Sequence, residues 1–192
     1  MTPTNTPKIR TPQYRLLETL CNACAVSGDE GAVRKIIRNQ LEPHTDNVQV
    51  DAIGNLLVNR AGKRPDRLKV MIAAHMDEIG FMLTYDDGDG IFRFDIVGGI
   101  DPRQLAGKPV LVGDERIPGV IGAKPIHLTT RRERKNTIAI KELRIDVGPD
   151  QKGKVKVGDR AAFATRYQRI GPSLRAKALD DRLGVATLIE LV

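Results

Sequence analysis

The sequence contains no tryptophan and few other aromatic residues, with three tyrosines and four phenylalanines among 192 residues. Proteins that bind single-stranded nucleic acid by stacking need aromatic platforms, so this scarcity argues against that class. No apolar run approaches the roughly 20 residues that a membrane-spanning helix needs. Residues 1–12 show no apolar core of a secretory signal. We therefore expect a cytoplasmic protein that does not span a membrane.

The sequence is also poor in cysteine. Cys21 and Cys24 are the two cysteines, and both fall on one expected helix, so a disulfide framework is not expected. A single pair at this spacing is a weak indication of a metal or redox site, because no second pair of ligands follows. The helical spacing favours the alternative that both thiols are buried and pack as small hydrophobic groups.

Charge is plentiful but unevenly distributed. The composition, 41% hydrophobic and 29% charged, is that of an ordinary globular protein, and the formal net charge is +7. Within residues 124–144, two glutamates face seven basic residues: Lys124, Arg131, Arg132, Arg134, Lys135, Lys141 and Arg144. Such a run can bind nucleic acid or an acidic partner, or it forms a solvated loop. No nucleic-acid-binding motif accompanies it, so we expect no nucleic-acid partner and keep that class as an alternative.

The most informative stretch is LKVMIAAHMDEIG, residues 68–80. Residues 68–74 are apolar except for Lys69, which predicts a strand covered on both faces, as in a parallel sheet. Open α/β sheets place their chemistry at the carboxyl ends of such strands. His75 and Asp77 follow there, which suggests a metal ligand with a carboxylate partner. The alternative is a core histidine at the end of a strand.

The surrounding pattern predicts an α/β layer. Apolar residues recur at helical spacing from Tyr14 to Cys24. Ser27 and Glu30 form a capping-box pattern for a second helix, which Pro43 ends. Residues 47–51 and 56–59 read as two strands joined by a Gly-Asn turn.

After Gly80 the pattern changes to short strands separated by glycine and proline turns. The strand candidates are residues 81–85, 91–97, 110–112, 117–121, 137–145 and 155–165. We expect a small all-β barrel or sandwich at 81–172, inserted into an α/β domain formed by 1–80 and 173–192. A helix is expected to begin near Asp181.

A second acidic pair, Asp180 and Asp181, stands at the start of that helix. One interpretation is structural: Asp180 caps the helix, Asp181 interacts with its dipole in the first turn, and Arg182 is a surface charge. The other interpretation makes the pair part of the site begun by His75, because the two motifs flank the β insert.

This combination resembles the M42 family of metallo-aminopeptidases, the glutamyl and deblocking aminopeptidases that are often labelled endoglucanases. Four stretches carry the resemblance: AHMDEIGFM (74–82), VGGIDPRQLAGKPVLV (97–112), GVIGAKPIHL (119–128) and KALDDRLG (177–184). It implies an incomplete zinc-peptidase-like α/β domain, with a parallel or mixed sheet, into which a β-barrel domain is inserted. It also implies hydrolysis of N-terminal residues from peptides at a site with two divalent metal ions, zinc or cobalt.

The resemblance assigns roles to three residues. His75 matches a ligand of one metal ion, and Asp180 matches the carboxylate that bridges both ions. Asp77 matches the catalytic-site residue that orients His75, and the extended chain directs both side chains to one face. A cis peptide between Asp180 and Asp181 is also implied.

The family's general base and its remaining ligands lie beyond the equivalent of Val192. His44 and His127 match no ligand position. We therefore expect an amino-terminal piece that binds metal weakly or not at all and is inactive as given. Relatives of this kind assemble through the insert into dimers and dodecamers, so a homo-oligomer is expected. The alternative function is a non-catalytic assembly or binding module formed by the β-domain.

Overall fold

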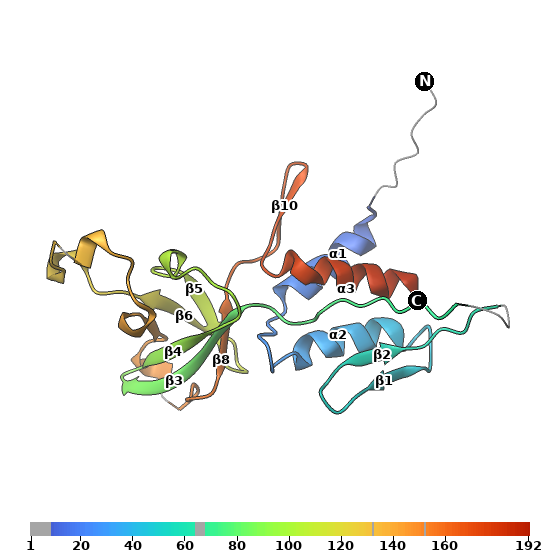
Figure 1. Cartoon of the computed structure of the whole chain (residues 1–192), viewed down its shortest axis with the longest axis horizontal. Helices are drawn as coiled ribbons and strands as arrows, with labels where there is room; N and C mark the ends of the chain where they lie inside the picture. The colour runs from blue at the N-terminus through green and yellow to red at the C-terminus, as the bar shows by residue number, and fades with distance from the viewer. Residues whose placement is uncertain (1–8, 64–67, 132, 152) are drawn as a thin grey trace, which may run out of the picture.

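The computed structural model describes residues 9–63, 68–131, 133–151 and 153–192. Figure 1 shows two parts side by side: a closed β-barrel, and a helical part with two small hairpins. The regular elements in chain order are α1 (Thr11–Asn22), α2 (Gly31–Leu41), β1 (Val48–Val50), β2 (Leu56–Val58), β3 (Gly80–Gly88), β4 (Ile91–Val97), β5 (Pro109–Val112), β6 (Ile117–Gly122), β7 (Arg144–Asp146), β8 (Arg160–Phe163), β9 (Gln168–Ile170), β10 (Ser173–Arg175) and α3 (Leu179–Leu191). Short 3₁₀ turns lie at Pro102–Gln104, Ile126–Leu128, Glu133–Lys135, Ile140–Glu142 and Pro149–Gln151. None of the helices in these ranges is long and apolar enough to cross a membrane.

The helical part packs α3 against α1 and α2 (Figure 1). The predicted apolar stripes explain this packing, because α1 buries Leu17 and Leu20 while α2 buries Val33 and Ile37. Val185 of α3 joins Leu20, Val33 and Ile37 in one core cluster. The two helices predicted before Pro43 are thus confirmed, and the predicted strands at 47–51 and 56–59 pair as the antiparallel hairpin β1–β2.

The capping box expected at Ser27 is wrong. Helix α2 begins at Gly31, its N-cap residue is Glu30, and no side chain caps it. The Glu30 carboxylate instead accepts a hydrogen bond from the backbone N–H of Gly28 at 2.5 Å. The Ser27 hydroxyl is directed away from α2, toward Asp77.

The strand expected over residues 68–74 is not formed. This segment runs along the helical part into β3 (Figure 1), but it joins no sheet. Leu68, Val70 and Met71 are 89%, 78% and 91% exposed. A strand of a parallel sheet needs hydrogen-bonded neighbours and covering layers, and the described residues place none beside this segment. The prediction of a buried strand over this segment is therefore wrong.

The barrel contains six strands in the order β3-β4-β7-β6-β5-β8, and β8 pairs with β3 to close it. All of these pairs are antiparallel. Strands with alternating apolar residues direct one set inward, and Phe81 contacts Phe94 and Phe163 edge-to-face, with ring centroids 5.1 and 5.2 Å apart. The β3–β4 turn uses residues with positive φ, including Gly88 at 93° and Gly90 at 78°, a conformation that suits glycine.

The first four strands predicted for the insert are confirmed within a few residues at their ends. The two long candidates are shorter: 137–145 contributes only β7 at its end, and 155–165 contributes β8. The β9–β10 hairpin was not predicted. Along the chain, this hairpin follows β8 and precedes α3.

Barrel and helical part meet at a closely packed joint. Gly80 pairs with Ala162 in the barrel, and a Cβ atom there would lie 2.5 Å from Val26 and 2.6 Å from the Ala161 carbonyl oxygen. Val26 forms a parallel bridge with Glu78, two residues before β3 begins. From β8, Arg160 donates a hydrogen bond to the Ser27 carbonyl at 3.2 Å. This joint lies directly beside the predicted site residues.

Candidate functional site

The three residues predicted for the site lie together. His75 Nδ1 is 2.9 Å from Asp77 Oδ1, and His75 Nε2 is 3.0 Å from Asp180 Oδ1. His75 and Asp180 are 105 residues apart in sequence. All three line a cleft of about 590 Å³, whose other walls include Phe163 of the barrel and Lys177. The cleft therefore opens where the two parts of the molecule meet.

Asp77 is held by a residue that the sequence analysis assigned elsewhere. The Ser27 hydroxyl donates a hydrogen bond to Asp77 Oδ2, while Asp77 Oδ1 faces His75. Each oxygen of the carboxylate thus has its own partner. No sequence signal indicated this contact, because Ser27 and Glu30 form a capping-box pattern and Asp77 lies 50 residues away.

The two acidic residues at the start of α3 have different contacts: Asp181 contacts the helix backbone, and Asp180 faces His75. Asp181 Oδ1 accepts a hydrogen bond from the Gly184 N–H at 2.9 Å, which is a capping interaction. Asp180 has non-helical backbone angles, its side chain is 95% exposed, and it faces His75. The peptide bond between the two is cis, as the resemblance implies. The interpretation of Asp180 as the cap is therefore wrong, because Asp181 has that role.

The surrounding charges shift the pKa of two site residues. Partial burial lowers the pKa of His75, but its hydrogen bonds with Asp180 and Asp77 outweigh burial and raise the pKa above its ordinary value of 6.5. The hydrogen bond from Ser27 lowers the pKa of Asp77 below 3.8; burial opposes this shift, and His75 adds to it. Both shifts have their cause in hydrogen bonds within the site.

Behind the site lies a buried cluster of three charged side chains, Glu78, Lys177 and Arg182. Lys177 Nζ donates to Glu78 Oε1 at 2.6 Å, and Arg182 Nη2 lies 3.7 Å from the same oxygen. The expectation that Arg182 is a surface charge is wrong, since it is fully buried and donates to the Leu20 carbonyl. Burial lowers the pKa of Arg182, and Glu78 opposes that shift.

The buried cluster connects the segments that carry the site. Glu78 follows Asp77, and Lys177 precedes Asp180 by three residues, so their ion pair joins the two segments. Lys177 also donates to the Ala23 carbonyl at 2.7 Å, and the Ala25 N–H donates to Glu78 Oε1 at 2.9 Å. Breaking a buried pair by removing one partner is strongly destabilising.

The donor chemistry at His75 and Asp180 fits part of a metal site. A neutral imidazole and a carboxylate are ligands that zinc and cobalt accept. Within the described ranges no group of three His, Cys, Asp or Glu residues converges closely enough to hold a metal ion. The two side chains therefore fit part of the ligand set that a metal ion needs.

The remaining predicted candidates lie away from this cleft. Cys21 lies in α1 and Cys24 just after its end; both are free and buried. Burial raises the pKa of both thiols, as expected for small hydrophobic side chains. His44 and His127 are exposed.

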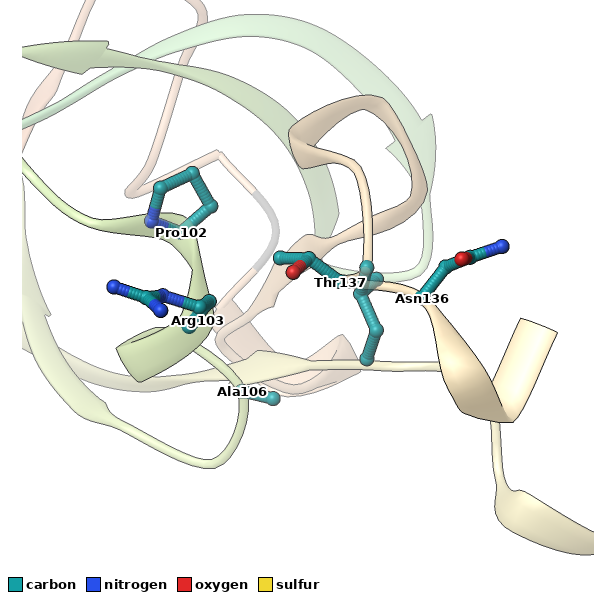
Figure 2. Close-up of a pocket in the computed structure, with 6 residues that line it drawn as sticks. Pro102, Arg103, Ala106, Asn136 and Thr137 are labelled. Atoms are coloured by element: carbon teal, nitrogen blue, oxygen red, sulfur yellow. The ribbon is translucent and has the colours of Figure 1, made fainter.

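The basic segment lies on the barrel. Arg144 contacts Asp87 at 2.6 Å and Arg134 donates to Thr129, while Arg132 lies outside the described residues. A small cavity of about 190 Å³ lies beside this segment, and Figure 2 shows Arg103 and Thr137 among its lining residues. Arg103 is paired with Asp101 at 2.5 Å, so its charge is already compensated. Nothing in the geometry of this cavity connects it to the His75 cleft.

Comparison with known proteins defines the class first. The putative aminopeptidase FrvX of Escherichia coli (strain K12) is 34% identical over 186 residues, which cover 92% of this chain and 51% of the relative. An aminopeptidase from the archaeon Desulfurococcus kamchatkensis superposes with a TM-score of 0.83 at 32% identity, covering 93% of this chain and 51% of that one. The TET1 peptidase of Pyrococcus horikoshii, described as assembling into a tetrahedron or a large octahedral shell, superposes with a TM-score of 0.78 at 35% identity over 93% and 55% of the two chains. The fold is that of part of a peptidase.

The family follows from a further match. The model of the M42 glutamyl aminopeptidase family matches residues 54–192, which is more than half of the chain. The chain belongs to this family, and the predicted α/β fold with a β-barrel is confirmed. The chain spans about half the length of the curated relatives it matches.

Proposed function

We propose that this chain contributes one part of the active site of a metal-dependent aminopeptidase that removes N-terminal residues from peptides. The observation that carries the proposal is the convergence of His75, Asp77 and Asp180 at one cleft, in a chain of the M42 family. Relatives described as aminopeptidases support the reaction class.

In this proposal His75 and Asp180 are the metal ligands. His75 would present Nε2 to a metal ion while Asp77 holds the proton on Nδ1, and the Asp180 carboxylate would supply oxygen ligands. Zinc or cobalt held by these residues would supply Lewis-acid chemistry for hydrolysis of a peptide bond. The chain's own residues orient the imidazole and keep its ligand nitrogen free of a proton.

The donor count sets the expected behaviour of these 192 residues. A catalytic metal ion generally needs three protein donors, and the described residues bring together two, His75 and Asp180. We therefore propose that this chain by itself binds metal weakly and does not turn over peptides. The remaining metal ligands and the general base would be supplied from outside these residues.

We further propose that residues 81–172 form the inserted domain through which copies of the chain assemble, with 1–80 and 173–192 forming the peptidase part. A relative described as forming tetrahedral and octahedral shells supports assembly into a homo-oligomer. The second candidate function, a non-catalytic assembly module formed by the barrel alone, is favoured by the barrel's complete strand pairing. Oligomers that form equally with and without metal would indicate that candidate.

The first experiment is elemental analysis of the purified chain together with hydrolysis of aminoacyl-anilides. We expect substoichiometric metal and no turnover. Titration with Zn²⁺ or Co²⁺ should show weak binding that His75→Ala and Asp180→Ala remove. The matched replacements of exposed residues, His127→Ala and Asp46→Ala, should leave it unchanged.

Two results would contradict the proposal. Nearly two metal ions per chain with turnover would show that the site is complete within these residues. Binding that does not depend on His75 and Asp180 would show that the metal site lies elsewhere.

A further inference from the structure

We propose that Ser27 is a positioning residue for the candidate metal site: through Asp77, it selects the tautomer of His75 whose Nε2 lone pair is free. The inference deepens the proposed function and rests on it for its meaning. It starts from the hydrogen-bonded series Ser27–Asp77–His75, in which each member is bound to the next. Ser27 touches neither a metal ligand's donor atom nor a substrate in this role.

The backbone of Ser27 is fixed from two sides. Its preceding residues pair with the segment that carries the site, since the Glu78 N–H donates to the Ala25 carbonyl at 2.8 Å and Val26 bridges Glu78. Arg160 of the barrel donates to the Ser27 carbonyl at 3.2 Å. The hydroxyl therefore projects from an anchored segment and is a fixed reference point for Asp77.

The Ser27 hydroxyl has no helix-capping duty that would explain it. The N-cap of α2 is Glu30, and the neighbouring Gly28 N–H is satisfied by the Glu30 carboxylate. The hydroxyl instead donates to Asp77 Oδ2. With one oxygen held in this way, rotation of the carboxylate is restricted and Oδ1 stays directed at His75 Nδ1.

The choice of tautomer follows from a competition between two carboxylates. A neutral imidazole has a single N–H, which can lie on Nδ1 facing Asp77 or on Nε2 facing Asp180. Asp77 is anchored by Ser27 and its side chain is 36% exposed, whereas the Asp180 side chain is 95% exposed. The Ser27 hydrogen bond makes Asp77 a weaker base, but it fixes Oδ1 at His75 Nδ1. This fixed geometry holds the proton on Nδ1, and Nε2 keeps the lone pair that coordination requires.

The test is the ¹⁵N NMR spectrum of the imidazole rings in the metal-free chain, recorded above the pH at which the His75 signals stop changing, so that the ring is neutral. The chain has three histidines, so His44→Gln and His127→Gln leave His75 as the single signal. In this background we expect Nδ1–H to be the major tautomer. Ser27→Ala should lower the ratio of Nδ1–H to Nε2–H by about two- to tenfold, the equivalent of one net hydrogen bond.

Matched variants separate the hydroxyl from the fold. Ser173→Ala, at an exposed serine of β10, should leave the ratio unchanged. Ser27→Thr and Ser27→Val have the same shape and differ in the hydroxyl, so Thr should retain the ratio and Val should lose it. This pair decides the question if Ser27→Ala does not fold, as checked by circular dichroism.

An unchanged ratio in both Ser27→Ala and Ser27→Val would overturn the proposal. The readout needs no metal and no substrate, so the two proposals fail separately. If the ratio falls as expected while the unmodified chain shows no affinity for Zn²⁺ or Co²⁺, the positioning effect stands and the proposed function is wrong. If metal binds through His75 but the ratio does not respond to Ser27, the proposed function stands and the positioning effect is wrong.

Discussion

The barrel and the helical part of this molecule are stabilised in different ways. Each barrel strand has two paired neighbours, and the barrel core is apolar, with Phe81, Leu83 and Ile145 fully buried. The helical part divides its apolar contacts among smaller clusters and buries three charged side chains. It also leaves the apolar segment 68–72 exposed.

The two parts differ in how fully their strand-like segments are paired. Closure removes the free edges of a sheet, so the barrel needs no further chain to complete its hydrogen bonding. The helical part contains a strand-like sequence that the described residues do not pair, and its cleft brings together the two proposed metal ligands, His75 and Asp180. Every barrel strand is paired on both sides, whereas the apolar segment 68–72 is exposed.

The largest expected effect tests the barrel core. Phe81→Ala removes a fully buried ring that contacts Phe94 and Phe163, and should lower the free energy of unfolding by about 3–5 kcal/mol. Urea unfolding followed by circular dichroism measures it. Val120→Ala, at a half-exposed position of β6, is the control and should cost less than about 1 kcal/mol. Equal losses in the two variants would show that the barrel interior is not the source of stability.

The second effect tests the charged core of the helical part. Glu78→Gln leaves Lys177 and Arg182 buried without a counter-charge, and should cost about 3 kcal/mol. The loss should appear in the helical signal of the unfolding curve. The control is Glu42→Gln, which affects an exposed pair with Arg38 and should cost at most about 1 kcal/mol. A neutral result for Glu78→Gln would mean that the helical part, like the barrel, depends on apolar packing alone.

A third, smaller effect concerns the site between the two parts. Because hydrogen bonds to Asp180 and Asp77 raise the pKa of His75, this interaction contributes stability fully below pH 6.5, and the contribution is lost as the pH rises through the higher folded pKa. Asp77→Asn should therefore lower the pKa of His75, and Asp46→Asn should not change it. An NMR titration of the His75 ring proton measures both. A pKa of His75 that does not respond to Asp77→Asn would show that the pair is not formed in solution.

The smallest effect on stability is expected at the exposed segment. Met71 is 91% exposed, so Met71→Lys should change the free energy of unfolding by no more than about 0.5 kcal/mol. The same change should reduce self-association, because exposed apolar strands promote contact between chains. Light scattering at matched concentrations measures this. A large loss of stability would show that the segment is buried in solution.

Elements that carry their information locally were predicted in both parts of the molecule. Hairpin strands such as β3–β4 carry their information locally, in alternation and in glycine turns. Residues 68–74 carry the pattern of a buried strand, but burial depends on neighbours that the local sequence does not contain. The β9–β10 hairpin, whose residues are mostly exposed, gave no apolar alternation to detect.

The same distinction applies to the site. His75, Asp77 and Asp180 were predicted to act together from short motifs, and the structure brings the three side chains to one cleft. The predictions for Ser27 and Arg182 were wrong because the local sequence favours a helix cap at Ser27 and a surface charge at Arg182. Their actual partners, Asp77 and Leu20, lie 50 and 162 residues away in the chain, a separation that no local pattern encodes.

The pairing of Gly80 with Ala162 also affects how the chain can fold. His75 and Asp180 lie 105 residues apart, but a closed barrel places its entrance and exit side by side and shortens the effective loop between them to roughly two dozen residues, which reduces the entropic cost of bringing them together by roughly 1 kcal/mol. Hairpins pair residues that are close in sequence, so they form before contacts whose loop closure costs more entropy. We therefore expect the barrel to fold first. His75 and Asp180 then come together beside the paired strands β3 and β8.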